Sequence, residues 1–155
     1  MSHGQTGALM KDSQEIAPAE GAAVWTADEM CGSERWVYRF TDEDVACLVG
    51  GLEHVRDRGL AIPFSAADFP IGAFAERLRK VRQEVEDGVG VMFMRGLPVD
   101  RLGLDGTRRV YWGMGAHLGT ALAQNPRAQL LVDVRDTGGD QYRDPTARGY
   151  HTTRR

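Results

Sequence analysis

The sequence has little lysine. Lysine occurs only at Lys11 and Lys80, the arginines are scattered among acidic residues, and the 155 residues carry a formal net charge of -3. Proteins that bind nucleic acid through phosphate neutralisation need a concentrated basic surface, and no such patch can be drawn here. We therefore expect no nucleic-acid partner.

Cysteine and long apolar runs are also scarce. Cys31 and Cys47 are too far apart for a CxxC motif, and residues 1–14 contain no apolar core of a signal peptide. No apolar run approaches the ~18 residues that a membrane span needs. We predict a cytoplasmic protein with reduced thiols and no membrane partner.

The overall composition is that of a globular domain. Hydrophobic residues make up 42% and charged residues 26% of the chain. Residues 1–22 have few large apolar side chains, so burial would not offset the entropy lost on ordering them. We predict a disordered tail over residues 1–22 and one domain over residues 23–155.

Aromatic residues alternate in the segment 36–40, which predicts a half-buried strand or an extended strap. Thr41 followed by Asp44 approximates a capping box and predicts a helix start. Gly59 is suited to end that helix. The helix carries apolar residues at helical spacing, namely Val45, Leu48, Val49, Leu52 and Val55.

A second helix is predicted from residues 68–70 to Gly88, with an apolar face and a charged face that we interpret as solvated. The apolar run Val89–Arg95 predicts a strand covered on both faces. The apolar positions of the helix are Ile71, Phe74, Leu78, Val81 and Val85, and the charged ones are Glu76, Arg77, Arg79, Lys80 and Arg82.

A third helix is predicted from Asp105 to about Leu118, with Val110, Tyr111, Met114 and Leu118 on one side. Its glycines have the wrong spacing for a dinucleotide loop, so we interpret them as sites of close helix packing. They are Gly113, Gly115 and Gly119. A turn is predicted at residues 124–126 and a further strand over Leu130–Arg135.

The motifs that usually mark catalytic or metal sites are not present. None of the four histidines, at positions 3, 54, 117 and 151, has a carboxylate two residues later. Ser33 and Ser65 lie outside any GxSxG motif. His117 fits helix packing better than metal ligation. We therefore assign no catalytic residue and no metal ligand.

Four segments in series nevertheless resemble one family. They are residues 68–100 (DFPIGAFAERLRKVRQEVEDGVGVMFMRGLPVD), 108–119 (RRVYWGMGAHLG), 124–138 (QNPRAQLLVDVRDTG) and 148–153 (RGYHTT). Their order and spacing resemble those of the TauD/TfdA-like iron(II)/2-oxoglutarate-dependent dioxygenases, over about residues 25–153. One departure is Arg127-Ala128, where the family commonly has glycine.

The resemblance implies an α+β fold, with N-terminal helices and the first strands of an incomplete double-stranded β-helix (jelly roll). It implies an oxidoreductase that hydroxylates a small organic substrate with Fe(II) and 2-oxoglutarate. In that family an HxD pair, a distal histidine and an arginine follow the RGYxT segment, and this sequence ends before them. We expect a portion that is inactive alone and does not bind these cofactors by itself.

The resemblance also implies substrate-binding residues, namely Gln124, Asn125, Tyr150 and Thr152. From the residues alone, turn formation and loop hydrogen bonding explain them equally well. His151 stands inside the YxT element and is not assigned as a metal ligand.

A second hypothesis is a non-catalytic binding or partner module that retains the scaffold. Either way the strands predicted at residues 89–95 and 130–135 would lack most of their sheet partners and expose apolar edges. We therefore expect self-association or a complementing C-terminal chain.

Overall fold

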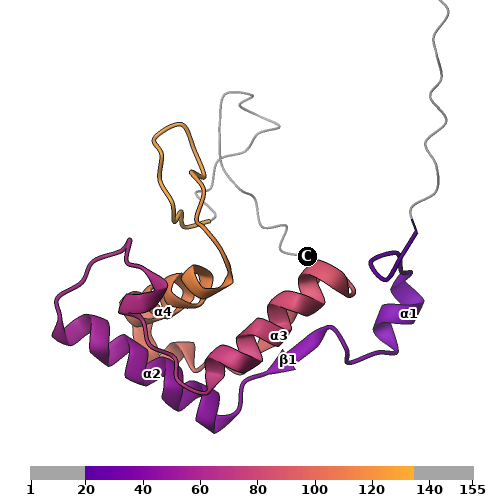
Figure 1. The fold of residues 1–155 in the computed structure, drawn as a ribbon, viewed down its shortest axis with the longest axis horizontal. Coiled ribbons are helices and arrows are strands. Elements are labelled where there is room, and N and C mark those ends of the chain that lie inside the picture. The colour runs from indigo at the N-terminus through magenta and orange to yellow at the C-terminus, as the bar shows by residue number, and fades with distance from the viewer. Residues whose placement is uncertain (1–19, 135–155) are drawn as a thin grey trace, which may run out of the picture.

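The computed structural model describes residues 20–134 (Figure 1). Helices dominate it, together with one pair of short parallel strands. In chain order the elements are α1 (Ala27–Cys31), β1 (Val37–Arg39), α2 (Asp42–Asp57), the 3-10 turn η1 (Ala66–Asp68), α3 (Phe74–Asp87), β2 (Phe93–Arg95) and α4 (Val99–Leu118). Helices and strands are both present, as the α+β prediction requires.

Helix α2 begins and ends where the sequence predicts. The Thr41 hydroxyl accepts from the backbone N–H of Asp44, and the Asp44 carboxylate accepts from the backbone N–H of Thr41, which completes the capping box. At the other end Gly59 adopts a φ of +62°, and Leu60 N–H donates to the Val55 carbonyl at 2.9 Å. This is a Schellman ending, for which glycine is favoured.

Helix α3 starts later than predicted. Asp68 does not open it but caps the separate turn η1, where its carboxylate accepts from the Ser65 hydroxyl and backbone N–H. Gly72 then takes a φ of +48°, and α3 begins at Phe74 and ends at Gly88. The periodic apolar positions continue across this break, so periodicity alone could not show where the helix starts. Val85, predicted to be apolar-facing, is exposed.

The two strands pair in parallel, with Val37 opposite Phe93 and Arg39 opposite Arg95. Parallel pairing requires a crossover, and α2, η1 and α3 provide it. The strand over 36–40 is half-buried as predicted, but only the last three residues of the 89–95 run are a strand. The Val89 carbonyl instead accepts from the Trp25 indole, and Phe93 is 50% exposed, so burial on both faces was wrong.

Helix α1 was not predicted from the sequence. A capping box was nevertheless present in the sequence, because Thr26 is followed three residues later by Glu29. The Trp36 indole donates to the Met30 carbonyl in α1, and Trp25 holds the preceding segment to Val89. In Figure 1, α1 lies at the opposite end of the molecule from α2.

Helix α4 is longer than predicted and has a kink. Gly103, at φ +68°, separates a first turn after Pro98 from the main helix, which matches the predicted span from Asp105 to Leu118. Val110 and Met114 are buried as predicted, and Leu118 is half-buried. Tyr111, predicted on the same side of the helix, is 63% exposed.

The core is built around Phe69, whose ring has no exposed surface. A side chain at Gly51 of α2 would meet this ring at 3.0 Å, and one at Gly113 of α4 would overlap it. Both helices therefore reach Phe69 only because they have glycine there. The other buried residues of this core are Leu48, Leu52, Val55, Phe64, Ile71, Phe74, Leu78, Val81, Val110 and Met114.

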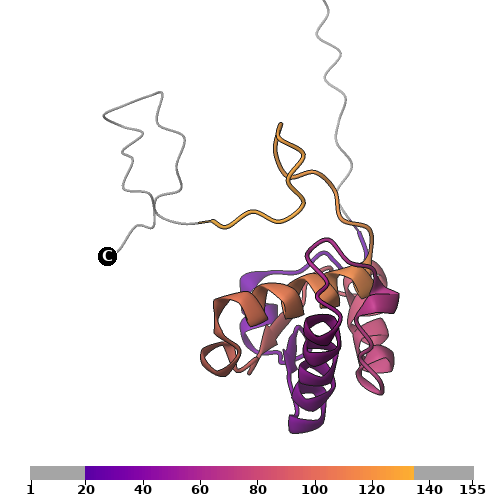
Figure 2. The same ribbon diagram turned by 90° about the vertical axis from the view of Figure 1, so that its left-hand side faces the viewer.

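The segment from Gly119 to Val134 leaves the end of α4 and extends away from the helices (Figure 2). The predicted turn is present, with Gln124 N–H donating to the Gln129 carbonyl at 2.7 Å. Residues 130–134 form no strand, so that prediction was wrong where the structure describes it. A strand needs a pairing partner, which periodicity does not reveal. The predicted tail falls almost entirely outside residues 20–134, and within that range no helix has the length and apolar character to span a membrane.

Exchanging two glycines of α4 for alanine tests the packing at Phe69. Gly113→Ala places a methyl group in the Phe69 ring, and overpacking of this kind costs about 1–3 kcal/mol. Gly115→Ala is the matched control, because a Cβ there meets nothing within 4 Å and alanine favours the helix by up to ~1 kcal/mol. Thermal unfolding should show a lower Tm for the first variant and an equal or higher Tm for the second. An equal decrease of Tm in both variants would contradict the packing of Gly113 against Phe69.

Candidate functional site

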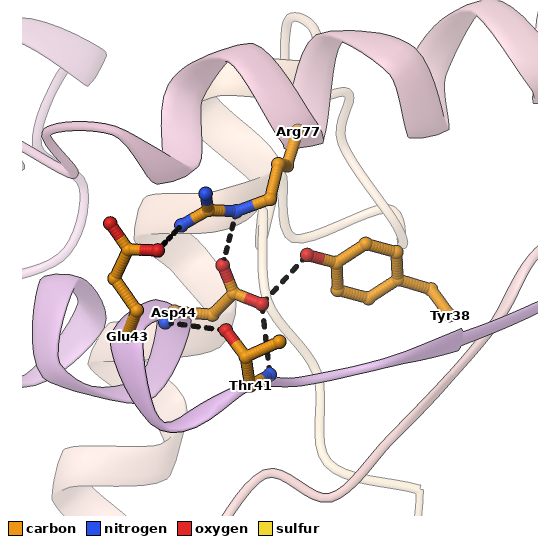
Figure 3. A network of polar contacts seen from close by, with 5 residues as sticks. All are labelled: Tyr38, Thr41, Glu43, Asp44 and Arg77. Atoms are coloured by element: carbon orange, nitrogen blue, oxygen red, sulfur yellow. Dashed lines mark hydrogen bonds and ion pairs between the residues drawn. The ribbon is translucent and has the colours of Figure 1, made fainter.

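Asp44 is the one fully buried charged residue within residues 20–134 (Figure 3). Its Oδ2 accepts from the Tyr38 hydroxyl at 2.7 Å and from Thr41 N–H at 2.9 Å, and its Oδ1 accepts from Arg77 Nε. Arg77 Nη2 also lies 3.3 Å from Glu43 Oε2. The cluster joins β1, the start of α2 and α3.

The pKa values in this cluster follow from burial and hydrogen bonding. Burial acts to raise the pKa of Asp44, but the bonds from Thr41, Tyr38 and Arg77 outweigh it and hold the pKa below its ordinary value. Burial and the bond to Asp44 raise the pKa of Tyr38 to about 12. Asp44 therefore stays ionised and Tyr38 stays protonated at neutral pH.

We interpret this cluster as architectural. Both carboxylate oxygens of Asp44 are already bonded to groups of the protein, which leaves it no role toward a ligand. The sequence placed Arg77 on a solvated face, and this was wrong because its side chain is only 31% exposed and lies against Asp44. Helical periodicity marks apolar positions and does not show where a charged residue finds its partner.

A groove lies on the outer side of α4, between this helix and the segment 119–134. It consists of two adjoining pockets of about 640 and 710 Å³, and both are lined by Tyr111, Leu130 and Leu131. We call it the α4 groove. Its larger pocket is mainly apolar, with Phe64, Met94, Trp112, Met114 and Leu118 among its lining residues.

Polar groups are concentrated in the smaller pocket. Arg108 of α4 pairs with Asp133 across it, with 2.9 Å between Nη1 and Oδ2, so the pair links the two walls. Thr107 Oγ1 is buried and has no hydrogen-bond partner within the part of the chain that the structure describes. Gln124 also lines this pocket. Apolar walls with a few polar groups are typical of small-molecule sites.

Of the four predicted substrate-binding residues, the structure describes Gln124 and Asn125, and only Gln124 lines the groove. Gln124 lies at the groove, and its side-chain amide donates to the Leu122 carbonyl at 2.9 Å. Asn125 shapes the turn, because its Oδ1 accepts from the backbone N–H of Arg127 and Gln129. Tyr150 and Thr152 lie outside residues 20–134, so nothing tests them.

Ala128 closes this turn in the left-handed region, with a φ of +57°. An alanine in this conformation carries roughly 1–2 kcal/mol of backbone strain, whereas glycine adopts the same conformation without strain. The resemblance implied a glycine near this position, and the backbone conformation gives the physical reason.

Thr107, Arg108 and Trp112 were not singled out from the sequence. Trp112 fixes the groove to the core, because its indole donates to the Phe64 carbonyl at 2.7 Å. A weak indication was available in the sequence, since Leu104, Arg108 and Tyr111 recur at helical spacing on a second face of α4.

The described residues do not fit an iron ion. Within residues 20–134 no group of three His, Cys, Asp or Glu side chains could hold a metal. His117, on α4, donates from Nε2 to the Phe69 carbonyl at 2.8 Å, which confirms its packing role. His54 Nε2 lies 3.4 Å from Arg58 on the surface of α2.

The chain is similar to part of a protein whose name describes it as a synthase. That enzyme is FR-33289 synthase of Streptomyces rubellomurinus (strain ATCC 31215), which is 27% identical over 136 residues. The match covers 87% of this chain, and the chain spans about 40% of the length of this curated relative. No protein-family model matches the chain.

Substituting Asp44 tests the buried cluster. Asp44→Asn removes the charge that Arg77 and Tyr38 face. Because a buried group is then left without a matching partner, the free energy of unfolding should fall by about 1–3 kcal/mol. The exposed neighbour Glu43→Gln is the control and should change the free energy of unfolding little. Denaturant unfolding at neutral pH measures both.

The pH dependence gives a second readout of the same variant. Folding lowers the pKa of Asp44 below its ordinary value of 3.8. The ionised side chain therefore contributes fully to the free energy of unfolding above pH 3.8, and this contribution is lost as the pH falls from 3.8 through the lower pKa of the folded state. The Asn variant should lose less stability than the parent across that range. Parallel pH profiles for both proteins would show that Asp44 is not the group responsible.

Proposed function

We propose that this chain forms the N-terminal, helical portion of an iron(II)/2-oxoglutarate-dependent dioxygenase of the TauD/TfdA-like kind, which oxidises a small organic molecule. The observation that carries the proposal is the series of four family-like segments at residues 68–153. The similarity of nearly the whole chain to 40% of FR-33289 synthase supports its being a portion of a larger enzyme.

In this proposal the described helices contribute binding and scaffolding. The α4 groove forms one wall of the substrate site, with apolar residues along α4 and polar groups at Thr107, Arg108 and Gln124. Such a wall orients an organic substrate and excludes water from it. The iron ligands and the jelly-roll strands belong to residues outside 20–134, and no chemical step is assigned to the described residues.

An exchange of segments tests the proposal. The 136 aligned residues of FR-33289 synthase are replaced by the matching residues of this chain, and product formation is followed by mass spectrometry with and without 2-oxoglutarate. We expect product that depends on 2-oxoglutarate, because the exchanged segments share one scaffold. The parent synthase is the positive control.

A chimera that melts cooperatively but makes no product would contradict the proposed function. That result would instead favour the alternative hypothesis of a non-catalytic module that keeps the scaffold. Product that forms equally well without 2-oxoglutarate would contradict the proposed class of enzyme.

Gln124→Ala in the active chimera tests the groove as a substrate wall. Loss of one hydrogen bond to the substrate, worth about 1.4 kcal/mol, should raise KM about tenfold and leave kcat nearly unchanged. Gln83→Ala on the exposed face of α3 is the matched control and should change neither constant. If both variants behave like the unsubstituted chimera, Gln124 does not contact the substrate.

A further inference from the structure

The smaller pocket of the α4 groove has one charged side chain of each sign. Arg108 lies on α4 and Asp133 lies on the segment 119–134, and among the described residues these two alone bring charge to the lining of this pocket. The remaining lining residues are apolar or carry uncharged polar groups. The charge that a ligand meets here therefore depends on whether both members of the pair keep their positions.

Arg108 is the fixed member of the pair. It stands in the middle of α4, and Val110 and Gly113 of the same helix are buried in the core. Asp133 belongs to the segment that follows Gly119, which forms neither helix nor strand up to Val134. Side chains on packed helices are held more precisely than side chains on irregular segments. When the pair opens, we therefore expect the carboxylate to move and the guanidinium to stay.

Opening this ion pair costs little. The side chains of Arg108 and Asp133 are 39% and 35% exposed, with 2.9 Å between Nη1 and Oδ2. Ion pairs that solvent reaches are weak, because water and salt compete for both charges. A carboxylate or phosphate group of a ligand makes the same charge-assisted bonds to a guanidinium that a protein carboxylate makes. Such a group can therefore take the place of the Asp133 side chain.

Hydroxyl donors lie beside Arg108 on the same helix. Thr107 Oγ1 is buried and has no hydrogen-bond partner among the residues that the structure describes. Tyr111 lines the same pocket and is four residues further along α4, so it shares a face of the helix with Thr107. A buried hydroxyl without a partner is costly, and a ligand oxygen would remove that cost. This face of α4 thus offers three donor groups to a ligand.

We propose that the α4 groove binds an organic anion, whose charged group replaces Asp133 on Arg108 and accepts a hydrogen bond from the Thr107 hydroxyl. This inference rests on the proposed function and names the chemical class of its substrate. The larger pocket is mainly apolar and takes the carbon skeleton of the anion. Asp133 is then a carboxylate of the protein itself, which holds the anion position on Arg108 until a substrate binds.

Probes that share one alkyl chain and differ in charge test this preference. Hexanoate, hexyl phosphate, hexanamide and hexylammonium are titrated into the full 155-residue chain. Binding is followed by NMR through the indole N–H of Trp112, which lines the larger pocket. We expect at least one of the two anions to bind about tenfold or more tightly than both hexanamide and hexylammonium. The tighter of the two anions identifies the charged group as a carboxylate or a phosphate.

Substituting each member of the ion pair separates anion binding from a purely structural role. Arg108→Gln should weaken binding of the preferred anion by about tenfold or more, because the cation is lost. Asp133→Asn should strengthen it by about threefold, because the competing carboxylate is lost. If the pair only joined the two walls, both substitutions would break it and change binding in the same direction. Arg101→Gln, at an exposed position of α4 outside the groove, is the control and should change nothing.

Hexanamide or hexylammonium binding as tightly as both anions would overturn the inference, and so would weaker binding in both pair variants or no change in either. These titrations need no turnover, so they are independent of the test of the proposed function. An active chimera together with a chain that does not prefer anions would leave the proposed function standing and overturn this inference. Anion binding by the chain together with a folded but inactive chimera would do the reverse.

Cooperative melting of the chain and its variants is checked first. If the isolated chain does not melt cooperatively, the same three substitutions are made in the chimera with FR-33289 synthase, and KM for the substrate of the synthase is measured. KM should rise about tenfold with Arg108→Gln, fall about threefold with Asp133→Asn and stay unchanged with Arg101→Gln. A change of KM in the same direction at positions 108 and 133, or at neither, would overturn the inference.

Discussion

The close approach of two helices to the ring of Phe69 is the constraint on which the described structure depends. Gly51 of α2 and Gly113 of α4 leave room for this ring, and His117 binds the carbonyl of the same residue. A single side chain therefore sets the spacing of α2 and α4. Because both glycines lie directly against this buried ring, an added methyl group would crowd it at Gly51 and overlap it at Gly113.

The buried carboxylate of Asp44 fixes the other end of the helical body. It caps α2, binds Tyr38 of β1 and pairs with Arg77 of α3, so three elements distant in sequence meet at one charge. A charge without exposed surface is tolerable only when its bonds replace those lost to water. The cluster thus specifies how β1 and α3 lie relative to α2.

Packing against Phe69 and two side-chain hydrogen bonds orient α4. Its inner face is fixed by Phe69, its Arg109 donates to the Leu60 carbonyl and its Trp112 donates to the Phe64 carbonyl. The outer face of α4 lines the α4 groove. A partly apolar wall is suited to orienting an organic substrate. The proposed function therefore depends on this one helix.

The sequence by itself determined the local features: the capping box at Thr41, the glycine end at Gly59, the stop at Gly88 and the turn after Gln124. These depend on neighbours in the chain, which a local pattern records. Tertiary structure alone decided that Arg77 meets Asp44, that residues 130–134 form no strand and that Tyr111 faces outward. It also placed Thr107 and Arg108 beside Gln124. Each of these outcomes depends on a partner far away in the sequence, and periodicity carries no information about that partner.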